Sequence, residues 1–203
     1  MKEHFVPSIR LFLALTLLLG FAYPLAVWGV GRLAFRKEAD GSFLRREESD
    51  GQSRVVGSLL IGQSFSSEKF FHSRPSAAGD AGYDATATGG TNLGPTSKKL
   101  ADAIAERVAA LRAENPNGGP LVPADAAMSS ASGLDPHISP GYARWQVPRV
   151  AATTGIPAAD LEAMITARTE GRFLGLYGEY RVNVLLLNLD VTARFESRSG
   201  AAR

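Results

Sequence analysis

The sequence predicts an α+β protein, in which one N-terminal transmembrane helix is followed by a single soluble domain of mixed helices and strands. Three observations carry this prediction. Residues 11–31 contain no charged side chain. Apolar residues recur at helical spacing in residues 98–113 and 157–169. The runs 55–61 and 182–189 are apolar and rich in β-branched residues or leucine, which favours strands.

The apolar segment 11–31 is long enough to cross a bilayer. At about 1.5 Å per residue it forms a helix of roughly 31 Å, close to the thickness of the hydrocarbon core. The alternative is a signal peptide cleaved after Ala22, which would release a secreted binding protein. The apolar run continues to Val30, however, and a signal h-region usually ends after about 7–15 residues. We therefore expect an uncleaved helix, preceded by a short N-terminus at residues 1–10.

Two features inside the span concern its packing. Pro24 lacks a backbone N–H, so it is expected to bend the helix or to free a carbonyl near Gly20. Ala22 and Ala26 form a small-xxx-small pair, on which a second membrane helix can lie closely. We therefore expect this side of the span to contact a partner helix.

The charges that flank the span do not fix its orientation. Lys2 and Arg10 precede it, and Arg32, Arg36 and Lys37 follow it. The positive-inside rule favours a cytoplasmic domain by a single charge, which is too small a difference to decide the topology.

Composition excludes several classes of function. The chain of 203 residues has a formal net charge of +2 and no cysteine. It therefore has no disulfides, thiol nucleophiles or Cys-ligated metals. No run of Lys and Arg with interleaved aromatic residues is present, which argues against nucleic-acid binding.

The rest of the chain divides by composition. Residues 32–54 are polar and charged, and we interpret them as a tether. Residues 55–195 are expected to form the α+β domain, and residues 196–203 a flexible tail. Within the domain, residues 72–97 are rich in glycine and proline and show no periodicity. A loop of that length usually serves a function or is ordered by a partner.

Local signals place the helices of the domain. The helix at 98–113 has Thr96 or Ser97 available as its N-cap. Ser139 and Pro140 are typical of a second helix start, and Pro148 is expected to break or kink that helix. The third helix, at 157–169, begins at a proline, and the run 182–189 is expected to be a central strand.

Three patterns that could carry chemistry are better explained structurally. The Gly-rich segment 89–98 resembles a phosphate loop, but Pro95 removes a required N–H donor. Ser130 or Ser132 with His137 and Asp135 could form a hydrolase site, yet residues so close in sequence usually point apart. The three histidines are scattered along the chain and do not predict a metal site: His4, His72 and His137.

The remaining polar candidates are expected to shape loops. Arg74 and Arg149 could bind anions, although pairing with carboxylates is the usual role of single arginines. Buried carboxamides are expected to satisfy loop backbone at Gln63, Asn92, Asn183 and Asn188. The sequence thus shows no recognisable active site, and its Gly-, Pro- and Asn-rich loops indicate a surface held by partners.

Taken together, several segments strongly resemble the C subunit family of the bacterial Kdp potassium-transporting ATPase. Besides the span and the segment from Gln146 to Arg149, these are GSLLIGQSF at 57–65, FFHSRPSA at 70–77, GGTNLGPTS at 89–97, SASGLDPHISP at 130–140 and RVNVLLLNLD at 181–190. The resemblance covers nearly the whole chain in order.

The resemblance implies a noncatalytic subunit of an ATP-driven potassium importer, needed for assembly and described in the family as a catalytic chaperone that raises the ATP affinity of the ATPase subunit. The partners it implies are a channel-like K⁺-translocating subunit, a P-type ATPase subunit, a small membrane subunit and the lipid bilayer. No cofactor or metal is expected on this chain, and ATP would be bound by the partner ATPase subunit.

The resemblance also implies a bacterial inner-membrane protein with a cytoplasmic N-terminus and an extracytoplasmic domain at residues 32–203. The residues that we expect at partner interfaces are Ala22, Ala26, Gln63, Arg74, Asn92, Asp135, His137, Gln146 and Arg149. The alternative function is a membrane-anchored serine hydrolase that uses Ser130 or Ser132 with His137.

Overall fold

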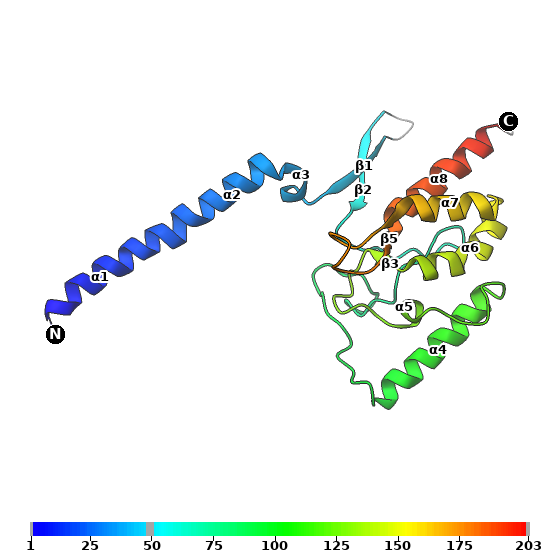
Figure 1. The fold of residues 1–203 in the computed structure, drawn as a ribbon, viewed down its shortest axis with the longest axis horizontal. Helices are drawn as coiled ribbons and strands as arrows, with labels where there is room; N and C mark the ends of the chain where they lie inside the picture. Colours follow the sequence, from blue (N-terminus) through cyan, green and yellow to red (C-terminus); the bar gives the residue numbers. More distant parts are fainter. Residues whose placement is uncertain (1, 48–50, 202–203) are drawn as a thin grey trace. The chain divides into compact units, whose positions relative to one another are not determined.

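The protein consists of two compact units, Met1–Val56 and Gly57–Arg203, and each is described by itself (Figure 1). The computed structural model describes residues 2–47 and 51–201. The unit boundary lies close to the expected start of the soluble domain at residue 55. The fold class is α+β, as the sequence predicts, with one long apolar helix followed by a mixed region.

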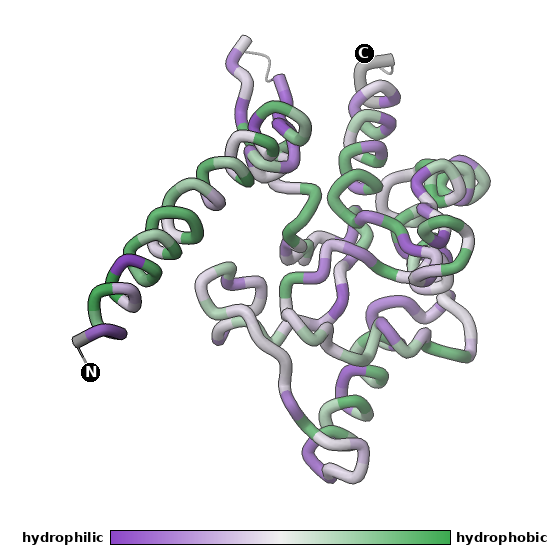
Figure 2. Tube along the Cα trace, turned by 60° about the vertical axis from the view of Figure 1, so that its left-hand side comes forward, coloured by the Kyte–Doolittle hydropathy of each residue, from purple (hydrophilic) through white to green (hydrophobic). Residues whose placement is uncertain are grey.

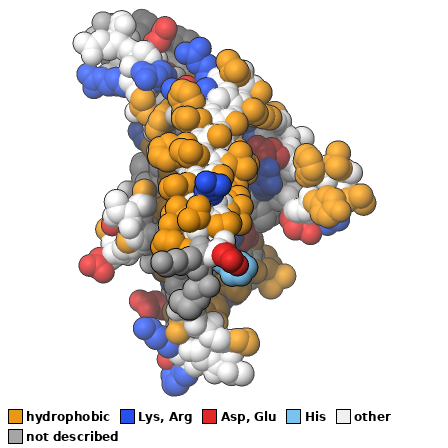
Figure 3. Space-filling view, turned by 90° about the vertical axis from the view of Figure 1, so that its left-hand side faces the viewer, with side chains coloured by type: hydrophobic (Ala, Val, Ile, Leu, Met, Phe, Trp, Pro, Cys, Tyr) orange, Lys and Arg blue, Asp and Glu red, His pale blue; other side chains and the backbone are white. Residues whose placement is uncertain are grey.

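The first unit begins with a nearly continuous helix. It comprises α1 (Lys2–Leu17), the π-helical turn η1 (Leu18–Ala22) and α2 (Tyr23–Ala34). Residues Glu3–Ala34 are long and apolar enough to cross a membrane, and none of their most apolar stretch is buried. Figure 2 shows the apolar residues along this helix, and hydrophobic side chains cover the face that Figure 3 turns to the viewer. This confirms the long apolar N-terminal helix that the sequence predicts.

The π-helical turn lies where Pro24 disturbs the hydrogen-bond ladder. In an α-helix, the carbonyl of Gly20 would pair with the N–H that Pro24 lacks. Instead, the N–H of Tyr23 bonds to the carbonyl of Leu18, one residue further back than in an α-helix. The expected disturbance near Gly20 is therefore present, as a wide turn.

The segment expected to be a polar tether contains regular structure. It forms the single turn α3 (Arg36–Ala39) and the strand β1 (Phe43–Glu47), which pairs with β2 (Ser53–Ser58). Residues 48–50 lie outside the described residues. The strand predicted at 55–61 thus begins two residues earlier and ends at Ser58.

The second unit packs helices around a small antiparallel sheet. Its helices are α4 (Lys98–Glu114), α5 (Ala124–Ala127), α6 (Pro140–Thr154), α7 (Ala158–Arg168) and α8 (Val184–Ala201). The sheet has the order β3-β5-β4, built from β3 (His137–Ile138), β4 (Thr169–Glu170) and β5 (Arg181–Asn183). Val182 on the central strand β5 lies opposite both Ile138 on β3 and Thr169 on β4.

The hydrophobic core lies between the sheet and helices α6, α7 and α8. Helix α7 packs on both α6 and α8. The largest fully buried apolar side chains are Tyr142, Phe71, Ile156, Leu161, Ile165, Leu187, Val150, Val182, Val184 and Val191. Phe71 comes from the irregular segment 59–97, which contains no helix or strand, as expected for 72–97.

Helix starts follow the predicted capping signals. Of the two candidates for the first cap, Ser97 fills the role, since its hydroxyl accepts from the N–H of Leu100 at 3.4 Å. Ser139 caps α6 by accepting from the N–H of Tyr142 at 3.0 Å. Of the break or kink predicted at Pro148, the break is wrong, because α6 continues to Thr154. Pro148 removes only one helical hydrogen bond, and packing of the buried flanking residues maintains the helix.

The central strand predicted at 182–189 is wrong. Only Arg181–Asn183 is strand, and α8 begins at Val184. The side-chain oxygen of Asn183 accepts from the N–H of Leu186 at 3.1 Å, which satisfies a free donor of the first helical turn. A short run that is apolar on all sides fits a buried helix start as well as a buried strand.

The described part of the expected tail also differs from the expectation. Residues 196–201 continue helix α8 as far as Ala201, whereas a frayed end is expected from the sequence. Residues 202–203 lie outside the described residues.

Candidate functional site

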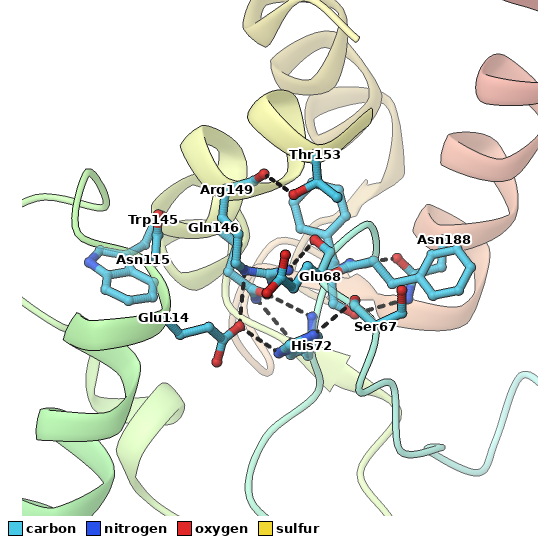
Figure 4. Close-up of polar contacts among 12 residues, drawn as sticks. Ser67, Glu68, His72, Glu114, Asn115, Trp145, Gln146, Arg149, Thr153 and Asn188 are labelled. Atoms are coloured by element: carbon cyan, nitrogen blue, oxygen red, sulfur yellow. Dashed lines mark hydrogen bonds and ion pairs between the residues drawn. The ribbon is translucent and has the colours of Figure 1, made fainter. Parts of the chain in front are cut away.

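The first group of functional candidates is a polar cluster, formed by the buried Gln146 and Arg149 and the more exposed His72 and Glu114 (Figure 4). The cluster joins the irregular segment before α4, the end of α4 and the middle of α6. The four side chains point toward one another, and dashed lines in Figure 4 mark their contacts. Gln146 and Arg149 are adjacent on α6 because they are three residues apart.

Arg149 is almost fully buried, with 5% of its side chain exposed. Its Nε lies 3.0 Å from Oε1 of Glu114, and its Nη2 donates to the carbonyl of Phe70 at 3.0 Å and to Gln146 Oε1 at 2.8 Å. Its Nη1 donates to the carbonyl of Glu68. A buried guanidinium needs such partners, because an unpaired buried charge is costly. Nε is close to Glu114 as an ion pair but makes no hydrogen bond among the described residues.

Two carboxamides hold consecutive residues of the loop. Gln146 Oε1 accepts from the N–H of His72 at 2.6 Å, and Gln146 Nε2 donates to the carbonyl of His72 at 3.1 Å. Asn188 makes the same pair of bonds with Phe71, at 2.8 and 2.9 Å. The loop is therefore paired with α6 and α8 as a strand is paired with its neighbours. This confirms that Asn188 satisfies loop backbone.

The imidazole of His72 contacts acceptors with both ring nitrogens. Its Nδ1 lies 3.0 Å from Oε1 of Glu114, and its Nε2 lies 3.1 Å from the carbonyl of Ser67. The hydrogen bond from His72 lowers the pKa of Glu114, burial opposes this, and the charges of His72 and Arg149 lower it further. Glu114 therefore stays ionised, and its carboxylate contacts both His72 and Arg149.

The second group, the loop junction, is formed by Arg74, Asp135 and His137. Arg74 Nη1 donates to Asp135 Oδ2 at 3.0 Å. Asp135 Oδ1 accepts from the N–H of His137 at 3.0 Å and lies 3.6 Å from His137 Nδ1. Burial raises the pKa of Asp135, but the hydrogen bonds from His137 and the charge of Arg74 outweigh it, so that the pKa is lowered.

Backbone contacts join the same two loops around the loop junction. Ser76 Oγ donates to the carbonyl of Gly133 at 2.6 Å, and the N–H of Gly89 donates to the carbonyl of Ser132 at 2.9 Å. Gly133 has φ +69°, and a Cβ on it would lie 2.8 Å from the backbone nitrogen of Ala78. Only glycine permits this close approach.

A cavity of about 320 Å³ lies beside both groups. It is lined by His72, Arg74, Tyr83, Arg107 and Glu114, among others. Its charged groups are already engaged: Arg74 with Asp135, Glu114 with Arg149, and Arg107 with the carbonyl of Ala127 at 3.0 Å. Their contacts fix the positions of the surrounding loops.

The geometry does not support the serine hydrolase. Ser132 Oγ accepts from the N–H of Leu134 at 3.1 Å, and the side chain that faces the ring of His137 is Asp135. Within residues 2–47 and 51–201, no hydrogen bond links Ser130 or Ser132 to His137. The described residues also contain no cluster of three or more His, Asp or Glu that could hold a metal.

The other predicted site residues are dispersed. Ala22 and Ala26 belong to the first unit. The backbone carbonyl of Gln63 accepts from Ser73 Oγ at 2.9 Å, and the Gln63 side chain is half-buried. Asn92 is exposed and has φ +52°, so the expectation that it is buried is wrong. Asparagine tolerates this left-handed conformation better than most residues.

Sequence reasoning missed Glu114 and the contacts of His72. Glu114 is the last residue of helix α4, and no local sequence pattern distinguishes it from a charged residue at any solvent-exposed helix end. Asn183 is confirmed as a residue that satisfies loop backbone, since its Nδ2 donates to the carbonyl of Leu59 at 3.0 Å.

Comparison with known proteins gives one consistent family. Residues 5–193 match the family model KdpC, described as K+-transporting ATPase, c chain. A Myxococcus xanthus protein named Potassium-transporting ATPase KdpC subunit is 50% identical over 202 residues, which is 100% of this chain and 93% of the relative. A protein of the same name from Caulobacter vibrioides is 50% identical over 195 residues, 96% of this chain and 95% of the relative. A third, from Sorangium cellulosum, is 48% identical over 189 residues, 93% of this chain and 97% of the relative.

Proposed function

The chain belongs to the KdpC family, the c chain of K⁺-transporting ATPases, and we propose from this premise that it is a noncatalytic subunit that stabilises the assembled pump. It is a membrane-associated subunit by its family and its N-terminal helix. It works through contacts with the other subunits and without a reaction of its own.

One observation carries this proposal. The charged and amide side chains at the candidate site are used to hold loop backbone, as Gln146 and Arg149 do with residues 68–72. Groups that are engaged in this way set the shape of a surface and are not available as nucleophile or base. A surface of fixed shape suits recognition, since little conformational entropy is lost when a partner binds.

The proposed topology follows the family resemblance. The N-terminus lies in the cytoplasm, the helix crosses the bacterial inner membrane, and residues 32–203 lie outside. Ala22 and Ala26 offer a close-packing side to a helix of the channel-like subunit. The loops at 72–97 and 130–140, joined at the loop junction, would face partner subunits near the potassium entrance. The P-type ATPase subunit and the small membrane subunit complete the proposed complex.

A raised ATP affinity of the ATPase subunit, as described in the family, fits this proposal only as an indirect effect. ATP is cytoplasmic, whereas the proposal places residues 32–203 on the other side of the membrane. The effect would therefore pass through the assembled subunits, as a coupling between distant sites.

The test is reconstitution of the pump with and without this chain. We expect the partner subunits to co-purify with the chain, and K⁺-stimulated ATP hydrolysis and K⁺ uptake into proteoliposomes to be largely lost in its absence. Partner subunits that assemble and transport normally without the chain would refute the proposal.

A second variant separates contact from chemistry. The double variant Ser130→Ala/Ser132→Ala removes both candidate nucleophile hydroxyls, and we expect it to restore transport as well as the unchanged chain does. Normal assembly with lost transport in this variant would indicate a chemical role and would contradict the proposal.

A further inference from the structure

The turn between β4 and β5 carries a group of exposed apolar side chains. Figure 1 shows the backbone of this turn, which leads from the end of α7 to β5. We call residues 172–180 the apolar hairpin. Five of its side chains are between 59% and 76% exposed: Phe173, Leu174, Leu176, Tyr177 and Tyr180. Large apolar residues scattered singly over a surface need no explanation, but a contiguous group such as this one marks an interaction site.

Backbone hydrogen bonds and an ion pair stabilise the apolar hairpin. Phe173 and Tyr177 exchange both backbone hydrogen bonds, at 2.8 and 3.0 Å, and the N–H of Leu176 donates to the carbonyl of Phe173 at 3.1 Å. The ion pair between Arg172 and Glu179, at 2.9 Å, closes its base. Such a preorganised loop loses little conformational entropy when its apolar tip is buried by a partner.

The charges at the base of the apolar hairpin cancel. Arg172 pairs with Glu179, and Arg181 pairs with Glu170 at 2.9 Å. Attraction to an anionic lipid surface depends on basic side chains whose charge is not compensated. A neutral base with an apolar tip is instead complementary to an uncharged, apolar groove in a protein, where apolar and aromatic side chains act as anchors.

We propose that the apolar hairpin docks into an apolar, uncharged groove on a partner subunit of the K⁺-transporting ATPase. This inference rests on the proposed function, because it names the element of this chain that makes the contact. The apolar hairpin is a different element from the loops at 72–97 and 130–140, for which a contact with partner subunits is expected from the sequence alone. The tip side chains are the anchors, and the ion-paired base is the rim.

The absence of cysteine makes a direct test possible. Leu176→Cys places a single thiol on the tip of the apolar hairpin, and Leu121→Cys places one at a matched site that is 82% exposed and lies outside it. Each full-length variant is labelled with a maleimide in two settings: in the purified pump, and alone in vesicles of phosphatidylethanolamine and phosphatidylglycerol. The labelling rate is measured on the band of this chain after gel separation.

We expect Leu176→Cys to react at least about tenfold more slowly in the pump than in vesicles, as for a buried interface anchor. Leu121→Cys should react equally fast in both. Equal rates for Leu176→Cys would overturn the inference. So would slow labelling in vesicles that lack the partner subunits, because that result would identify the bilayer or a second copy of this chain as the occupant.

A loss-of-contact variant gives a second readout. The triple variant Leu174→Asn, Leu176→Ser and Tyr177→Ser removes the apolar tip, and asparagine suits the positive φ of Leu174, +52°. When this variant is purified, we expect at least about tenfold less partner subunit to co-purify with it than with the unchanged chain, as when several interface anchors are lost. Leu121→Ser should retain the wild-type amount. If the unchanged chain fails to retain partners, the proposed function fails, whereas equal retention by the unchanged chain and the triple variant refutes this inference alone.

Discussion

Replacing Gln146 by leucine tests how much the polar cluster stabilises the domain. Gln146 is 1% exposed and makes three hydrogen bonds: from the N–H of His72 at 2.6 Å, from Arg149 Nη2 at 2.8 Å, and to the carbonyl of His72 at 3.1 Å. Leucine has a similar volume, so Gln146→Leu removes the bonds without opening a large cavity.

The expected cost follows from the groups left without a partner. A buried polar group that loses its hydrogen bond costs about 1–3 kcal/mol. The side chain of His72 is 17% exposed, so water can partly replace Gln146 at this residue. Arg149 keeps Glu114 as its ion-pair partner and two carbonyls as acceptors. We therefore expect the free energy of unfolding to fall by about 3 kcal/mol in total, the low end of three such losses.

The assay is urea unfolding of the full chain in detergent micelles, followed by the fluorescence of Trp145, which is buried on α6. Trp28→Phe in every variant removes the signal of the membrane helix. With a slope of about 2 kcal/mol per M urea, the unfolding midpoint should fall by about 1.5 M. The control is Asn117→Leu at an exposed carboxamide, with an expected change within about 0.5 kcal/mol. A midpoint for Gln146→Leu equal to that of the control would refute the reasoning.

Two further predictions concern pH and backbone strain. Folding lowers the pKa of Glu114 below its ordinary value of 4.5, so its contribution to stability is complete above that value and is lost as pH falls through the lower folded pKa. Glu114→Gln should therefore flatten the acid limb of stability against pH in urea titrations, and an unchanged limb would contradict this assignment. Gly133→Ala should destabilise the domain by about 2 kcal/mol or more, because it combines a positive φ with a close approach to Ala78. Gly119→Ala, which also has a positive φ but faces open space, should cost about 1 kcal/mol. Thermal unfolding of both variants measures these losses, and equal losses would show that the contact with Ala78 contributes nothing.

Local chemistry was sufficient to predict most helices. The starts of α4 and α6 depend on hydroxyls that lie three residues before the amide they accept from, and Ser97 and Ser139 display this in the sequence. The same is true of the disturbance that Pro24 causes in the span, since the missing N–H and the carbonyl it would pair with are four residues apart.

The run that begins at Val184 shows where local reasoning fails. Its side chains are buried on all sides, so neither a period of two nor one of 3.6 residues is visible in the pattern. The choice of helix is made by Asn183, which bonds Leu186 on one side and the distant carbonyl of Leu59 on the other. Only the folded chain brings Leu59 to this position.

The candidate site shows the same division. Its arginines and carboxamides could be named from their residue types, and Asp135 and His137 are close in sequence. Glu114 could not be found, because it meets His72 and Arg149 from 42 and 35 positions away along the chain. The exposure of the apolar hairpin could not be predicted from the sequence either, because residues 172–180 are no more apolar than the buried segments around them.

The sequence by itself determined the long apolar N-terminal helix, the mixed fold class and the family, since these depend on local composition and on the order of motifs. The tertiary structure decided which side chains are paired, which apolar residues remain exposed, and where the last strand becomes a helix. The physical reason is that burial and hydrogen-bond partners are properties of contacts between residues such as His72 and Gln146, 74 positions apart. Those contacts exist only when the chain is folded.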